Sequence, residues 1–206
     1  MTKHVLDPSV LRGAVAALEG GGVIALPTET VYGLACDAAN HDAVSRLFAL
    51  KGRPDNVPLP VALPDATRVD DWRAQADARL DMLATRWWPG PLTVVVPANE
   101  GVSARITAGL ATVALRVPDE PRCAAVLASF GRAIVLTSAN RHGEPPARSA
   151  EAVASAFPSG LPVIVDGGPS PIGRPSTLVE LLPGGAWRVL REGVVTSADL
   201  AFVLDA

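Results

Sequence analysis

The chain of 206 residues is long enough to form one sizeable hydrophobic core, and 49% of its residues are hydrophobic while 19% are charged. A net charge of −3 argues against a protein whose main role is to coat nucleic acid, and no apolar run is long enough to span a bilayer. Because residues 1–21 lack the apolar segment of a signal peptide, we expect a globular protein of the cytoplasm.

Helical and strand-like patterns alternate along the chain. The first half predicts a helix at 8–19 with Asp7 as its N-cap, a strand at 23–27, an extended segment at 30–38, a helix at 41–50 and a short strand at 58–63. The second half predicts a helix at 75–88, strands at 92–98 and 112–118, a helix at 121–130, strands at 133–140, 161–168, 176–181 and 186–193, and a helix at 196–204. The sequence thus predicts one α/β domain with a large twisted sheet.

Polar side chains spaced at i and i+2 follow three of these elements: Thr28 and Thr30, Lys51 and Arg53, and Ser138 and Asn140. In an extended backbone, residues with this spacing point to the same side. Pro54 disfavours helical backbone at Arg53, which predicts that the pair at 51 and 53 is extended.

The pair of cations suits a polyphosphate, because Lys supplies a point charge and Arg a fork that binds two oxygens. Lys51 is one of only two lysines in the chain. The alternative is that both cations merely favour the end of the preceding helix through its dipole. Similarly, the other two pairs, taken alone, are compatible with an ordinary turn and a cap.

The strand at 112–118 carries an arginine among β-branched residues. Val113, Leu115 and Val117 share one face of it. Arg116 is on the other face with Ala114, and an arginine there needs an acidic partner or an anion, so both a salt bridge and a ligand carboxylate are open. Arg191 raises the same choice, and Ser176 follows a loop rich in glycine and proline.

Several familiar sites are missing from the sequence. It contains no GxxxxGK[ST], GxGxxG or GxSxG motif, which argues against a P-loop, a dinucleotide-binding fold and a hydrolase elbow. His4, His41 and His142 share no metal-ligand spacing, and no acidic motif suggests a dedicated metal site. Cys36 and Cys123 are far apart and are expected to be buried thiols.

Seven stretches, taken in order, carry a resemblance to a known family: "GGVIALPTETVYGLACDA", "LFALKGRP", "WPGPLTVVVPA", "VALRVPDEP", "VLTSANRHGEPP", "RPSTLVE" and "VLREG". They run from about Gly20 to Gly193, and the ordered set resembles the YrdC-like family of L-threonylcarbamoyl-AMP synthases. The resemblance implies a YrdC-like domain with its core at about 8–193, a concave basic cavity, and the single-domain form of the family.

The activity implied by the resemblance is the condensation of L-threonine, bicarbonate and ATP to threonylcarbamoyl-AMP, with release of pyrophosphate. Mg²⁺ is expected to arrive with the ATP. A separate transferase complex is then expected to pass the threonylcarbamoyl group to tRNA, and weak RNA binding by this chain is compatible with that role. No membrane partner is expected.

The resemblance also implies roles for individual residues. The family's KxR…SxN signature corresponds to Lys51, Arg53, Ser138 and Asn140, which would contact the nucleotide and its phosphates. The threonine side would be formed by Thr30, with Thr28 and Tyr32 beside it, and by Arg116 and Ser176; Thr112 and Arg191 would lie on the nucleotide side. We therefore expect Lys51→Ala or Arg53→Ala to abolish most activity without unfolding the protein.

One stretch departs from the family pattern. Many relatives read KGRPxxNPLxxH, whereas this chain has Val57 at the Asn position and Ala62 at the His position, with Asn56 one place early. Contacts made by those two side chains must be absent here, replaced, or supplied by the backbone.

Two other functions compete with the synthase. A carbamoyl-transfer module, like the one in hydrogenase-maturation proteins, would use carbamoyl phosphate, but the chain lacks the zinc cysteines of those proteins. A non-catalytic binding protein for structured RNA is disfavoured by the acidic pI near 5.6 and by the absence of aromatic stacking motifs.

Overall fold

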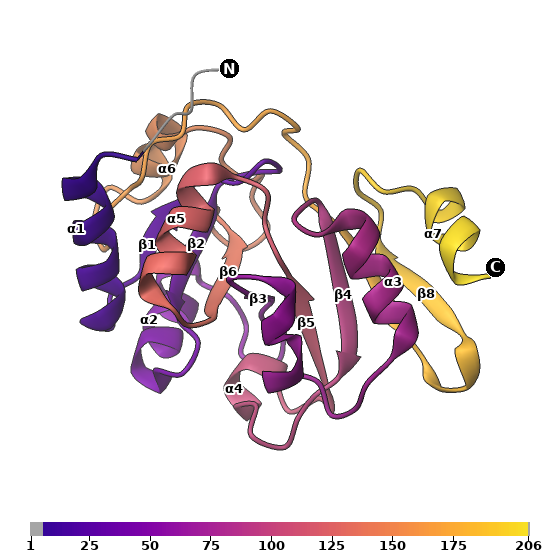
Figure 1. Ribbon diagram of the computed structural model, residues 1–206. Helices are drawn as coiled ribbons and strands as arrows, with labels where there is room; N and C mark the ends of the chain where they lie inside the picture. The colour runs from indigo at the N-terminus through magenta and orange to yellow at the C-terminus, as the bar shows by residue number, and fades with distance from the viewer. Residues whose placement is uncertain (1–5, 206) are drawn as a thin grey trace.

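The computed structural model describes residues 6–205, and its framework is one eight-stranded mixed sheet (Figure 1). The strand order is β1-β2-β6-β3-β5-β4-β7-β8. The strands are Ile24–Leu26 (β1), Gly33–Asp37 (β2), Val61–Ala62 (β3), Leu92–Pro97 (β4), Thr112–Arg116 (β5), Ile134–Ser138 (β6), Thr177–Leu181 (β7) and Trp187–Arg191 (β8). β3 pairs with β5, and β4 with β7, in parallel; the other neighbours are antiparallel. The predicted α/β class is confirmed.

Helices connect and flank the strands. The α-helices are Pro8–Glu19 (α1), His41–Lys51 (α2), Ala78–Trp87 (α3), Ala104–Thr107 (α4), Pro121–Phe130 (α5), Ala150–Ala156 (α6) and Ser197–Leu204 (α7), and 3₁₀ turns cover Ala66–Asp71 (η1) and Pro183–Gly185 (η2). The Asp7 side chain accepts a hydrogen bond from the Ser9 amide at 2.7 Å, and Pro8 occupies the first helical position, which confirms the predicted start of α1.

The two faces of the sheet are covered differently. On one face, buried side chains of β1–β6 pack with side chains of α2, α3, α6 and α7, including Leu47, Leu83 and Leu200. On the other face, α1 and α5 cover β1 and its neighbours through Leu18 and Val126 (Figure 1). These two helices cover only the β1 side of this second face. The part of the face formed by β5, β4, β7 and β8 is therefore left open.

Some sequence predictions differ from the structure. The predicted strand at 161–168 is absent apart from a single bridge between Ile164 and Ala25, because Pro162 has no amide hydrogen to donate and the two glycines at 167–168 turn the chain. The sequence patterns also missed α4, α6 and η1, which are short and have little periodicity. Cys36 and Cys123 are buried free thiols, as expected, and burial raises the pKa of Cys36 to about 12.

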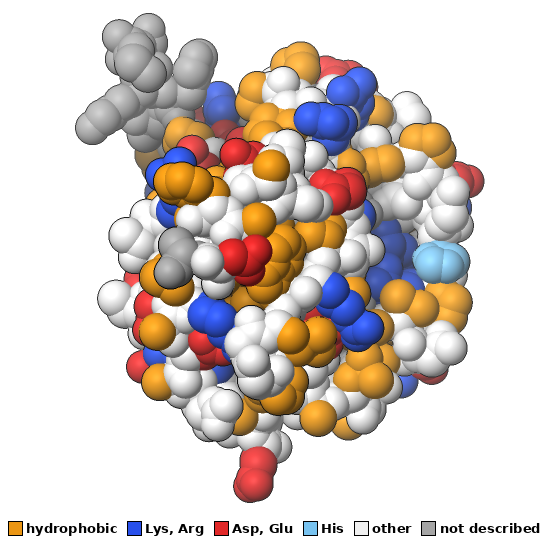
Figure 2. Space-filling view, turned by 90° about the vertical axis from the view of Figure 1, so that its right-hand side faces the viewer, with side chains coloured by type: hydrophobic (Ala, Val, Ile, Leu, Met, Phe, Trp, Pro, Cys, Tyr) orange, Lys and Arg blue, Asp and Glu red, His pale blue; other side chains and the backbone are white. Residues whose placement is uncertain are grey.

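The outer surface mixes charged and apolar groups. Figure 2, turned toward the side where α7 and β8 lie in Figure 1, shows cationic and hydrophobic side chains next to one another. Leu190 on β8 and Phe202 on α7 are exposed hydrophobic residues. Within residues 6–205, no helix combines the length and the apolar character needed to cross a membrane.

Candidate functional site

A cavity of about 320 Å³ lies over the open part of the sheet. Its floor is formed by alternate residues of the strands, such as Ala114 on β5 and Leu178 on β7, whose neighbours Val113 and Val179 face the core. This alternation on β5 confirms the prediction that Arg116 and the three buried hydrophobic residues occupy opposite faces. A volume of this size is typical of a small-molecule site.

Seven of the eleven predicted site residues line this cavity: Thr30, Arg53, Thr112, Arg116, Ser138, Ser176 and Arg191. They come from segments spread over most of the chain. The other four are Thr28, Tyr32, Lys51 and Asn140, which are buried behind the wall of the cavity.

The prediction of an extended pair at Lys51 and Arg53 is wrong. Helix α2 continues through Lys51, and Gly52 ends it in the left-handed region with φ of 65°. The amide of Arg53 donates to the Phe48 carbonyl at 3.1 Å, which closes the helix end, and Arg53 itself lies outside the helix, as expected from Pro54. The two side chains therefore diverge: Arg53 lines the cavity, and Lys51 enters the interior.

The Lys51 side chain binds the end of strand β6. Its Nζ donates to the Ser138 carbonyl at 2.5 Å, the Asn140 carbonyl at 3.0 Å and the Asn140 Oδ1 at 2.8 Å. The Ser138 hydroxyl in turn donates to Asn140 Oδ1 at 2.6 Å. Lys51 is only 2% exposed, so in this structure its ammonium group orders the SxN segment and does not face the cavity.

Burial makes the charge of Lys51 sensitive to pH. Loss of hydration and the nearby charge of Arg53 lower the pKa of Lys51 from 10.5 to about 7. Since the unfolded lysine titrates near 10.5, the folded protein binds fewer protons than the unfolded chain between about pH 7 and pH 10.5.

We therefore expect the unfolding free energy of the wild type, measured relative to Lys51→Met, to rise as the pH increases from 7 to 10.5 and to stay constant below pH 7. Urea denaturation of both proteins across this range measures the difference, in which the titration of all other groups cancels. A difference that is independent of pH would contradict the lowered pKa.

Arg53 is a cation without a carboxylate partner among residues 6–205. Its Nε donates to the Val57 carbonyl at 3.1 Å and its Nη2 to the Pro58 carbonyl at 2.7 Å. Burial and the positive charge of Arg191 lower the pKa of Arg53. Val57, at the position where many relatives have Asn, contributes its backbone carbonyl to Arg53. Ala62 leaves the cavity wall without an imidazole.

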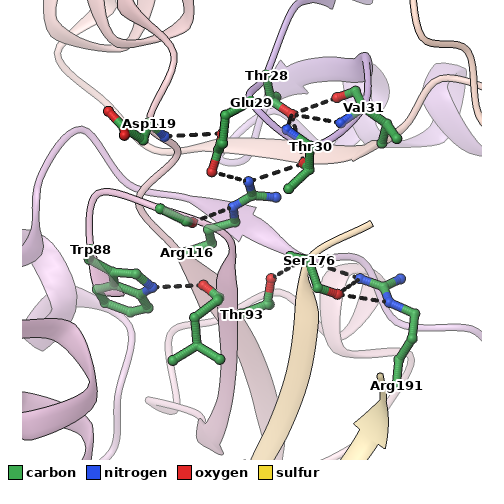
Figure 3. Close-up of polar contacts among 12 residues, drawn as sticks. Thr28, Glu29, Thr30, Val31, Trp88, Thr93, Arg116, Asp119, Ser176 and Arg191 are labelled. Atoms are coloured by element: carbon green, nitrogen blue, oxygen red, sulfur yellow. Dashed lines mark hydrogen bonds and ion pairs between the residues drawn. The ribbon is translucent and has the colours of Figure 1, made fainter. Parts of the chain in front are cut away.

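Arg116 forms the centre of a second polar group at the cavity (Figure 3). Its Nη2 donates to Glu29 Oε1 at 2.6 Å and to Thr30 Oγ1 at 3.1 Å, and its Nε donates to the Gly90 carbonyl at 3.0 Å. The Arg116 and Glu29 side chains are 11% and 10% exposed. The sequence left open a salt bridge or a ligand, and the structure shows the salt bridge.

Ser176 and Arg191 also line the cavity and lie to the right of this group in Figure 3. Arg191 donates to the Ser176 carbonyl at 2.9 Å and to its hydroxyl at 3.2 Å, and that hydroxyl lies 2.7 Å from the Thr93 hydroxyl. Gly193 permits this arrangement, because a Cβ there would lie 2.4 Å from the Thr177 amide nitrogen. Thr93 lines the cavity as well, although sequence reasoning did not select it.

The other two predicted threonine-side residues support the wall. The hydroxyl of Tyr32 donates to the Gly168 carbonyl at 2.9 Å and accepts from the Gly167 amide at 3.0 Å. Thr28 lies 2.8 Å from the Thr30 hydroxyl, and its own hydroxyl accepts from the Thr30 and Val31 amides at 3.2 Å, so this pair forms the turn left open by the sequence and not an extended pair. Neither Thr28 nor Tyr32 lines the cavity. Of these three residues, Thr30 is the one exposed to the cavity.

No cluster of three or more His, Cys, Asp or Glu able to hold a metal occurs in the part of the chain that the structure describes. Among these residues, the carboxylate lining the cavity is Glu180, which accepts from Arg188 at 2.6 Å. The cavity therefore presents cations and hydroxyls to a ligand.

Comparisons with known proteins point to one family. The Sua5/YciO/YrdC family model, described as "Telomere recombination", matches residues 16–193. A threonylcarbamoyl-AMP synthase of Bacillus subtilis is 40% identical over 198 residues, covering 92% of this chain and 57% of the relative. One of Alkalilimnicola ehrlichii is 39% identical over 196 residues, covering 95% of both chains.

A solved structure, P. abyssi Sua5 complexed with L-threonine, matches with a TM-score of 0.90 and 37% identity over 94% of this chain and 56% of that chain. The chain thus spans about half the length of the Bacillus subtilis and Pyrococcus abyssi relatives, and nearly the full length of the one from Alkalilimnicola ehrlichii.

Proposed function

The chain belongs to the Sua5/YciO/YrdC family, and on that basis we propose that it joins L-threonine, bicarbonate and ATP to form threonylcarbamoyl-AMP and pyrophosphate. The curated relatives named above are threonylcarbamoyl-AMP synthases, and a structural relative holds L-threonine. Transfer of the product to tRNA by a separate complex, and a cytoplasmic location, are parts of the same proposal.

The observation that carries the proposal is the presence of two kinds of polar group in one cavity. Arg53 and Arg191 have no carboxylate partner among residues 6–205, and such cations favour the binding of an anion such as a triphosphate. Arg116 is neutralised by Glu29, and a neutral ion pair is complementary to a zwitterionic amino acid. A synthase needs both ligands side by side.

The chemistry requires positioning more than covalent catalysis. The amine of threonine first forms a carbamate with bicarbonate, releasing water; a carbamate oxygen then attacks the α-phosphorus of ATP, and pyrophosphate leaves. Arg53 and Arg191 would hold and neutralise the phosphate oxygens, and Arg116 would orient the amino acid. Mg²⁺ would be held by phosphate oxygens and water, since Glu180 is already bonded to Arg188.

The test is release of pyrophosphate by the purified protein with ATP, Mg²⁺, bicarbonate and L-threonine, leaving out one component at a time. We expect release that requires both threonine and bicarbonate. Release that is indifferent to threonine, or none from folded protein, would reject the synthase.

The same assay, extended, distinguishes the two alternatives. Turnover of carbamoyl phosphate in place of threonine and bicarbonate would indicate a carbamoyl-transfer module. Salt-dependent RNA binding that persists with ATP and threonine, without turnover, would indicate an RNA-binding protein.

A further inference from the structure

The arginines that line the cavity differ in what lies behind them. Arg116 is paired at 2.6 Å with Glu29, a carboxylate that does not line the cavity, whereas Arg53 is held by backbone carbonyls. The second oxygen of Glu29 accepts from the Asp119 amide at 3.2 Å (Figure 3). Glu29 is therefore fixed by two partners, and its charge cancels that of Arg116 at this end of the cavity.

The hydroxyl of Thr30 has a defined polarity. The Thr28 hydroxyl donates its one proton to the Val31 carbonyl at 2.5 Å, so the 2.8 Å contact between the two threonines must be a bond donated by Thr30. The Thr30 hydroxyl oxygen accepts a hydrogen bond from Arg116 at 3.1 Å, which leaves one lone pair of that oxygen available to a ligand. Because Thr30 lines the cavity, it offers a hydrogen-bond acceptor and no donor to a ligand.

Arg116 retains donors for a ligand. Its Nε and Nη2 are bonded to Gly90, Glu29 and Thr30, and no hydrogen bond from its Nη1 exists within residues 6–205. These bonds hold the guanidinium plane in place. A ligand carboxylate can thus bind at Nη1 while an ammonium group binds at the acceptor of Thr30.

We propose that Glu29 sets the preference of the cavity for a zwitterionic amino acid over a simple carboxylate, acting through Arg116 without touching the ligand. This inference rests on the proposed function, because it assigns the amino-acid substrate to this end of the cavity. Glu29 is accordingly a positioning and specificity residue. Without its charge, Arg116 would attract any anion and repel an ammonium group.

The test compares three small ligands by calorimetry: L-threonine, 2,3-dihydroxybutanoate, which lacks the ammonium group, and L-threoninol, which lacks the carboxylate. In Glu29→Gln we expect the preference for threonine over the dihydroxy acid to fall by about tenfold. In Arg116→Gln the remaining charge is that of Glu29, so the effect on selectivity is the opposite. We expect the affinity for L-threoninol to rise about tenfold relative to the affinity for threonine.

Matched variants separate selectivity from damage to the fold. Glu29→Asp keeps the charge, so it should bind all three ligands more weakly but with the wild-type preference. Glu120→Gln removes a buried carboxylate that pairs with Arg122 at 3.2 Å away from the cavity lining, and it should leave the preference unchanged.

The outcomes separate this inference from the proposed function. Equal losses for threonine and the dihydroxy acid in Glu29→Gln would overturn the inference and leave Glu29 a purely structural residue. Circular dichroism shows whether Glu29→Gln is folded. If it is unfolded, the inference is supported by a reversed ligand preference in Arg116→Gln together with the wild-type ligand preference in Glu29→Asp. Any other pattern overturns it. A wild type that binds no L-threonine would reject the proposed function itself.

Discussion

Arg53→Ala is expected to lower the rate of pyrophosphate release by about 100- to 1,000-fold, which corresponds to about 3–4 kcal/mol of transition-state stabilisation. The guanidinium lines the cavity and has no carboxylate partner among residues 6–205, so its charge is available to the phosphates. The fold should survive, because the bonds that are lost go only to the carbonyls of Val57 and Pro58 in a surface loop.

Two variants control this prediction. Arg68→Ala removes an exposed arginine paired with Asp71, and it should keep wild-type turnover. Arg53→Lys keeps the charge but loses the fork that binds two oxygens, so its turnover should lie between those of the wild type and the alanine variant. Wild-type turnover in Arg53→Ala would show that Arg53 has no part in stabilising the transition state.

Lys51→Met is expected to lower both stability and activity. The side chain is buried and donates to the Ser138 and Asn140 carbonyls; in the variant the Ser138 carbonyl keeps the Asn140 amide at 3.1 Å, and the Asn140 carbonyl loses its donor. Leaving the Asn140 carbonyl unsatisfied costs about 1–3 kcal/mol in the free energy of unfolding. The expectation from sequence was a loss of most activity in a protein that remains folded, and the structure adds a loss of stability to it.

Urea denaturation at pH 8 and the pyrophosphate assay measure the two effects. Arg46→Met is the matched control, because Arg46 donates to the Gly21 carbonyl at 2.6 Å at a distance from the cavity lining. It should lose some stability and keep its turnover. A Lys51→Met protein with wild-type stability and no activity would instead assign Lys51 a direct contact with the phosphates, as the sequence first suggested.

Local signals in the sequence were sufficient to predict those features of the fold that depend on residues close together in the chain. Asp7 and Pro8 set the start of α1, and alternation set the two faces of β5, because caps and strand periodicity act over a few residues. The same reasoning was right that the helix stops before Arg53 but wrong at Lys51, which is the last residue of α2, because the helix ends only at Gly52.

Partners that are distant in sequence could not be predicted. Glu29 was passed over as part of a turn, although Arg116 was correctly expected to need an acidic partner or an anion. Their sequence separation is 87 residues, and no periodicity reports a contact over such a range. Thr93 could not be identified as a cavity residue either, because a β-branched side chain is equally typical of a buried strand.

The order of the strands has a consequence for how the protein is made. β6 lies between β2 and β3, and β4 lies between β5 and β7, so neighbours in the sheet are often far apart along the chain. Such topologies fold slowly, because distant segments must meet before their contacts stabilise anything. Arg53 is synthesised well before Ser176 and Arg191, which line the same cavity. The part of the cavity formed by Arg191 thus cannot be complete until β8 has emerged, so a ligand held there cannot assist the earlier steps of folding.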